Sequence, residues 1–108
     1  MKLRLVLADT DEEYLDKFVE CVREYYADEI EIASFTEVIE LKNYLAAEKV
    51  DMVLYSAVFQ GVIMQTPSIL LVEDDHMNLG EDIQVICKYR KFSDMYKRIV
   101  PEVEKHVQ

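Results

Sequence analysis

Two short clusters of side chains and one cysteine carry the groups that could do chemistry in this 108-residue sequence. Glu73–His76 (EDDH) has the residue types of a metal site, but it lacks the spaced Cys and His ligands of a tetrahedral centre, so we interpret it as a solvated acidic loop. Asp11–Glu13 (DEE) stands at the start of a predicted helix, where carboxylates interact favourably with the helix dipole. Cys87 precedes Lys88, and a thiol beside a cation is a candidate nucleophile, although an inward-facing core thiol explains the same position.

The composition excludes several classes of function. Acidic residues outnumber basic ones 22 to 12, and the net charge of −10 argues against binding to nucleic acid or to an anionic membrane. The two glycines are isolated, so there is no glycine-rich phosphate loop of the kind that binds nucleotides or flavins. Two distant cysteines without a CxxC motif indicate reduced thiols, and neither a signal peptide nor a run of ~18 apolar residues occurs. We expect a cytoplasmic protein without a cofactor.

Strands and helices alternate along the chain. The predicted strands are Lys2–Ala8, Glu29–Ala33, Asp51–Tyr55, Ser68–Val72 and Ile83–Cys87. The predicted helices are Asp11–Tyr26, Ser34–Ala47 and Ser93–Val107. This alternation predicts a parallel sheet with helices on both faces, in one domain that spans residues 1–108.

Local signals set the starts and ends of the helices. The pattern Thr10-x-x-Glu13 is a capping box that starts the first helix. A second capping box, Ser34-x-x-Glu37, starts the second helix. Pro101 lies inside the last predicted helix, so we expect a kink or a new turn there.

Two connections are short for a parallel sheet. About ten residues, Ala57–Thr66, join the third and fourth strands, and Glu73–Asp82 is similar, so we expect shortened third and fourth helices. The first connection carries five apolar residues: Val58, Phe59, Val62, Ile63 and Met64. They are either exposed as an interface or folded down over the sheet, and the sequence leaves both alternatives open.

The order of these segments resembles the receiver domain of two-component response regulators, over about residues 2–100. VLADTDEEYLDKF is similar to the receiver opening, and VDMVLYS to the third strand, which usually ends at the phosphorylated Asp. PSILLV is similar to the fourth strand, VICKY to the fifth strand with its Lys, and FSDMYKRI to the start of the last helix. The resemblance implies an α/β, flavodoxin-like, three-layer αβα sandwich with a five-stranded parallel sheet of order 2-1-3-4-5.

The resemblance also implies where the phosphate site of a receiver would lie. Receivers have two adjacent metal-binding acids after the first strand, where this chain has Asp9 followed by Thr10. Ser56 replaces the phosphoacceptor Asp at the end of the third strand. Val72 replaces the Thr or Ser that ends the fourth strand, and the Lys after the fifth strand is kept as Lys88. The site is therefore a degenerate version of the family's site.

These replacements remove the chemistry of phosphate transfer. Ser56 cannot form an acyl phosphate, and Asp9 alone is a poor Mg²⁺ site. Lys88 then pairs most simply with Asp9, a weak anion site being the alternative. Val72 lacks the hydroxyl that binds phosphate, and Val85 replaces the aromatic switch residue of the fifth strand. We therefore predict a non-catalytic pseudo-receiver that acts through protein–protein interaction.

Two other functions stay open. An atypical working receiver would accept phosphate or bind Mg²⁺ at Asp9 or Asp11, and these two carboxylates are the metal candidates of the chain. A small ligand-binding flavodoxin-like domain would instead have a polar pocket at the carboxyl ends of its strands. The missing glycine-rich loop counts against this last function.

The resemblance implies a protein partner or a fused output domain. One analogy is the N-terminal receiver-like domain of some pilus-assembly ATPases of the deviant Walker class, so the chain is either the N-terminal part of a longer protein or a free-standing regulator. In the family, the usual partner or homodimer surface is formed by the last strand and the last helix. That surface corresponds to Val85, Met95 and Ile99 in this chain.

Overall fold

The computed structural model describes residues 2–63, 66–73 and 85–105. The sheet contains β1 (Leu3–Ala8), β2 (Ile30–Phe35), β3 (Met52–Tyr55), β4 (Ser68–Val72) and β5 (Val85–Cys87). The helical elements of these ranges are α1 (Glu12–Tyr25), α2 (Val38–Ala47), the short 3-10 helix η1 (Ala57–Val62) and α3 (Phe92–Lys105). Every neighbouring pair of strands is parallel, and their order is β2-β1-β3-β4-β5, which confirms the predicted topology.

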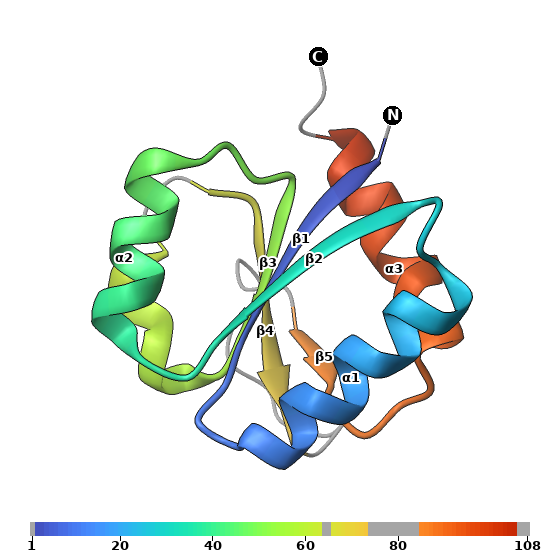
Figure 1. The fold of residues 1–108 in the computed structure, drawn as a ribbon, viewed down its shortest axis with the longest axis horizontal. Helices are drawn as coiled ribbons and strands as arrows, with labels where there is room; N and C mark the ends of the chain where they lie inside the picture. Colours follow the sequence, from blue (N-terminus) through green and yellow to red (C-terminus); the bar gives the residue numbers. More distant parts are fainter. Residues whose placement is uncertain (1, 64–65, 74–84, 106–108) are drawn as a thin grey trace.

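Helices cover both faces of the sheet. α1 and α3 lie on one face, and α2 with η1 lies on the other (Figure 1). Leu5 and Leu7 of β1 belong to the core under α1 and α3, whereas Val6 and Ala8 belong to the core under α2 and η1. Successive side chains of a strand point to opposite faces, which explains why β1 is apolar at almost every position. The three-layer αβα sandwich is therefore confirmed.

The first helix begins one residue later than the predicted capping box allows. Asp11 is the N-cap of α1, and its side chain accepts a hydrogen bond from the backbone N–H of Tyr14. Asp9 in turn accepts a hydrogen bond from the N–H of Asp11 at 3.0 Å. The prediction that Thr10 caps this helix is wrong because Asp9 holds Asp11, which is an equally good capping residue, in the capping position.

The second capping box is also wrong. β2 continues through Phe35, because Ser34 and Phe35 pair in register with Leu7 and Ala8 of β1. α2 begins at Val38 after the N-cap residue Glu37, whose side chain makes no capping hydrogen bond. Sheet pairing over two further residues thus replaces the predicted helical turn. Val38, the first residue of α2, is 37% exposed.

The first short connection forms one compact element. η1 spans Ala57–Val62, in agreement with the expected shortened third helix. Phe59 and Ile63 fold down over the sheet and are buried, whereas Val58 is 63% exposed. The connection therefore folds down over the sheet at Phe59 and Ile63, whereas an interface at the exposed Val58 stays a prediction. Met64 and the predicted fourth helix lie outside the described residues.

The last helix runs without interruption from Phe92 to Lys105, with Pro101 inside it. Met95 and Ile99 are buried in the core against α1 and the sheet, since they lie on the inner face of α3. The expectation that these two side chains form a partner surface is therefore wrong. Val85, the third residue of that surface, is half-buried and packs against the core on the opposite face of the sheet. No helix in the described ranges is long and apolar enough to span a membrane.

The burial of Met95 can be tested by its effect on stability. Met95→Ala removes most of a fully buried side chain, so we expect the free energy of unfolding to fall by ~2–5 kcal/mol. Tyr25→Ala, at a position that is 71% exposed, serves as the control and should change stability by no more than ~0.5 kcal/mol. Urea denaturation measures both variants, and equal small effects would contradict this placement of α3.

Candidate functional site

The carboxyl ends of the strands meet around one cavity of about 440 Å³. Asp9 follows β1, Ser56 follows β3, Val72 ends β4 and Lys88 follows β5. Parallel strands bring their carboxyl ends to the same edge of a sheet, and in such folds this edge is the usual ligand site. The cavity is lined by Asp9, Thr10, Ser56, Ala57, Val58, Gln60, Leu70, Leu71, Val72, Glu73 and Lys88. All five residues that the resemblance assigns to the receiver site (Asp9, Thr10, Ser56, Val72 and Lys88) thus lie together.

A buried ion pair stands at the wall of this cavity. The Lys88 Nζ atom donates a hydrogen bond to Asp9 Oδ2 at 2.8 Å, and the two side chains are only 7% and 5% exposed. The other carboxylate oxygen, Asp9 Oδ1, accepts the N–H of Asp11. Both oxygens of Asp9 therefore already have partners within the protein.

Two aromatic rings surround the ammonium group of Lys88. The Nζ atom lies 4.4 Å from the ring centroid of Tyr14 and 5.6 Å from that of Tyr89, within cation–π range. Burial lowers the pKa of Lys88, but the hydrogen bond and the charge of Asp9 outweigh it, so that the pKa is raised above its ordinary value. Lys88 is therefore held in its charged form.

Tyr14 is the functional neighbour that sequence reasoning missed. The seven tyrosines are scattered along the sequence and form no motif there. A signal was nevertheless present, because a first-turn residue of the helix that follows Asp9 projects back over the end of β1. Burial, and next the charge of Asp9, raise the pKa of the Tyr14 hydroxyl.

Ser56 contributes a buried hydroxyl with no hydrogen-bond partner among the described residues. Its backbone is fixed on both sides, because its N–H donates to the carbonyl of Ala8 and its own carbonyl accepts the N–H of Phe59. A serine nucleophile needs a neighbouring base. Both histidines, His76 and His106, lie outside the described residues.

The donor set does not fit the divalent cation that a receiver binds. A Mg²⁺ ion is held by one or two carboxylates that are free to bind it. Here Asp9 is paired with Lys88, Asp11 caps α1, and Thr10 offers no charge. In the described ranges no three His, Cys, Asp or Glu side chains are grouped closely enough to hold a metal ion. The EDDH cluster lies outside the described residues except for Glu73.

The thiol of Cys87 does not face this cavity. Cys87 is buried in β5 and its sulfur lies 3.8 Å from the carbonyl oxygen of Glu73, as a weak donor. Lys88 does not contact it as a charge partner, because its Nζ atom is bound to Asp9. The interpretation of Cys87 as a reduced core thiol therefore agrees with the structure.

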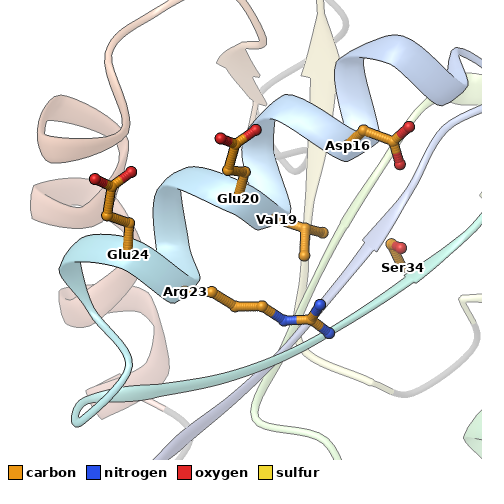
Figure 2. A pocket seen from close by; sticks show the side chains of 6 residues that line it. All are labelled: Asp16, Val19, Glu20, Arg23, Glu24 and Ser34. Atoms are coloured by element: carbon orange, nitrogen blue, oxygen red, sulfur yellow. The ribbon is translucent and has the colours of Figure 1, made fainter.

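A second hollow, of about 570 Å³, lies between α1 and β2. Figure 2 shows its lining side chains: Asp16, Val19, Glu20, Arg23, Glu24 and Ser34. The carboxylates of Glu20 and Glu24 point away from Ser34, and Arg23 extends from the helix toward the strands. Because its polar groups do not converge, we place the candidate site at the ends of the strands.

Comparison with known proteins adds a family. A family model described as TadZ-like, receiver domain, matches residues 1–102. The signal receiver domain of an HD domain-containing protein from Pseudomonas fluorescens Pf-5 is 18% identical with a TM-score of 0.73, over 98% of this chain and 97% of that chain. No curated protein matches.

Two further solved structures show the same fold. A CheY-like response regulator receiver domain protein from Methanospirillum hungatei JF-1 is 13% identical with a TM-score of 0.74, over 97% of this chain and 96% of that chain. The N-terminal domain of a response regulator/sensory box/GGDEF 3-domain protein from Carboxydothermus hydrogenoformans is 8% identical with a TM-score of 0.73, over 95% of each chain.

The Asp9–Lys88 pair gives a direct prediction for stability. Asp9→Asn leaves a buried ammonium group without its charge partner, so we expect the free energy of unfolding to fall by ~3–5 kcal/mol. The double variant Asp9→Asn/Lys88→Met should be less destabilised than the sum of its single variants by ~0.5–3 kcal/mol. The same double-mutant cycle on Glu13 and Lys17, an exposed ion pair at 3.2 Å, should give a coupling below ~0.5 kcal/mol. Equal coupling in both cycles would contradict a structural role for Asp9.

A second prediction concerns alkaline pH. The pKa values of Lys88 and Tyr14 are both raised, so the folded protein keeps protons that the unfolded chain loses above pH ~10. The contribution of these two groups to the free energy of unfolding is therefore fully present below that pH and is lost as the pH rises. Tyr14→Phe removes one of these titrating protons, so the free energy of unfolding should decrease less steeply with pH, by at most ~1.4 kcal/mol per pH unit. Urea denaturation from pH 7 to 11.5 measures it, and parallel curves for the two proteins would refute this account.

Proposed function

The chain belongs to the TadZ-like receiver-domain family, and we propose that it is a pseudo-receiver that signals by binding a protein partner, without accepting phosphate. Receiver domains are in general signalling domains and not catalysts. The single observation that carries the proposal is Ser56, which stands directly after β3 where a receiver has its phosphoacceptor Asp. Its hydroxyl has no neighbouring base among the described residues and cannot form an acyl phosphate.

The surroundings of Ser56 support the same proposal. A receiver uses its conserved Lys to bind the phosphoryl group, but Lys88 is bound to Asp9 at 2.8 Å. The end of β4 presents Val72, which has no hydroxyl to offer a phosphoryl oxygen, and Val85 has no ring to rotate. A phosphate-driven switch needs an element with two arrangements, and these replacements remove both of its moving side chains.

Phosphorylation at Asp9 or Asp11 is disfavoured by the contacts of both carboxylates. Asp9 is buried, and each of its oxygens already accepts a hydrogen bond. Asp11 accepts the backbone N–H of Tyr14 as the cap of α1. Modification of either carboxylate would break the hydrogen bonds that fix the start of α1 and the position of Lys88.

The proposal includes a cytoplasmic location and a partner that is either a separate protein or a fused output domain. The receiver-type neighbours support a fused domain, because one of them is the N-terminal domain of a 3-domain protein and another belongs to an HD domain-containing protein. A deviant Walker ATPase is one candidate for the output domain, by analogy with pilus-assembly ATPases. A homodimer through β5 and α3 would have to use exposed residues, since Met95 and Ile99 are buried.

The decisive test is titration with Mg²⁺ and beryllofluoride, which mimics a phosphoryl group on an Asp carboxylate. We expect the backbone amide signals of residues 9, 56 and 88 in NMR spectra to stay within ~0.05 ppm of their starting values, because no carboxylate is free at the phosphoacceptor position. The matched control is Thr10→Asp/Ser56→Asp, which restores both missing acids and should respond to millimolar Mg²⁺. A response of the unmodified chain equal to that of the variant would refute the proposal.

A further inference from the structure

The cavity at the strand ends has lost the charge that attracts an anion. Its lining contains one cation, Lys88, and two carboxylates, Asp9 and Glu73. Because Asp9 neutralises Lys88 at 2.8 Å, Glu73 leaves the lining with an excess of negative charge. Phosphate and other anions are therefore repelled from the cavity.

The other walls are suited to an aliphatic side chain. Ala57, Val58 and Val72 are apolar lining residues, and Val58 is 63% exposed. The volume of about 440 Å³ lies within the range of ligand pockets, ~300–1,000 Å³. Ser56 also lines the cavity, and its buried hydroxyl has no partner among the described residues.

Exposed apolar side chains also stand at the start of α2, and together with Val58 they are called the rim here. Val38 and Ile39, in the first turn of α2, are 37% and 58% exposed. α2 contacts η1, which carries Val58, and the first turn of α2 lies at the same end of the sheet as η1 (Figure 1). Three of the five large hydrophobic side chains that are exposed in the described residues thus stand at this end of one layer.

Acidic side chains flank this rim and restrict what can cover it. Glu37, the N-cap of α2, and Glu40 of α2 lie beside the rim, and both are exposed. Asp11–Glu13, at the start of α1, are exposed as well, whereas Asp9 just before them is buried. The whole chain carries a net charge of −10. A second copy of the chain would bring acids against acids, whereas a basic partner would gain attraction on approach and after docking.

We propose that the cavity and its rim, formed by Val38, Ile39, Val58, Val72 and Ser56, bind a basic segment of a partner protein that inserts one aliphatic side chain into the cavity. The Lys and Arg residues of that segment lie against the acids that flank the rim. This inference rests on the proposed function, because a working phosphate site would leave no room for such a side chain. It names the chemistry of the partner and moves the docking surface from α3 to the α2–η1 side of the sheet.

The test is selection of peptides from a random displayed library on the unmodified chain. We expect enrichment of peptides with one Leu, Ile, Val or Met between Lys or Arg residues. The tightest selected peptide should shift the amide signals of residues 56–58 and 72, and its affinity should fall several-fold when NaCl rises from ~50 to ~500 mM. Selection of acidic peptides, or of none, would overturn the inference.

Paired variants separate this surface from the rest of the molecule. Val58→Asp places a charge at the mouth of the cavity and should weaken the selected peptide at least ~10-fold. Tyr25→Asp changes the most exposed large hydrophobic residue, at the end of α1, and should leave the affinity within ~2-fold. Equal effects of the two variants, or signal shifts confined to α3, would overturn the inference and leave the proposed function standing.

Two further outcomes concern other occupants. Analytical ultracentrifugation tests whether a second copy of the chain is the occupant, and we expect a monomer. Self-association that Val58→Asp abolishes would make a second copy the occupant and overturn the inference. A response to beryllofluoride would refute the proposed function itself, whatever the peptides do. The failures of the two proposals are therefore distinguishable.

Discussion

The buried ion pair between Asp9 and Lys88 connects the end of β1 to the end of β5, across the two strands that lie between them. Because removing one partner would leave the other charged and buried, the two residues constrain each other strongly. Tyr14 stacks on the cation, and Asp9 also holds the N–H of Asp11, which caps α1. The start of the first helix, the end of the first strand and the end of the last strand are thereby fixed relative to one another.

The same pair determines the character of the cavity beside it. In a receiver the two residue types at these positions serve phosphate, but here their charges cancel within the protein. The rest of the cavity lining consists of apolar residues, the acid Glu73 and the uncharged polar residues Thr10, Ser56 and Gln60. In the function and docking mode that we propose, the position that binds an anion in receivers takes an uncharged side chain, with the same arrangement of the strands.

The short connection between β3 and β4 shapes the other half of this surface. Among the described residues of this connection, Phe59 of η1 and Ile63 just after it are buried, whereas Val58 is exposed beside the cavity. α3, by contrast, turns its apolar residues Met95 and Ile99 fully into the core. Three of the five exposed large hydrophobic side chains among the described residues, Val38, Ile39 and Val58, are thus on the α2–η1 side.

The sequence by itself determined the alternation of elements and the shortened third helix, because apolar periodicity and the length of a connection are local properties of the chain. The resemblance of the segment order to receivers implied the strand order and five of the residues that line the cavity. Only the tertiary structure decided three other features. Ser34 pairs with β1 as part of β2, Met95 and Ile99 are buried in the core, and the ring of Tyr14 lies against the ammonium group of Lys88. Each depends on contacts between residues far apart in the sequence, and local propensity carries no information about which distant side chain will be the neighbour.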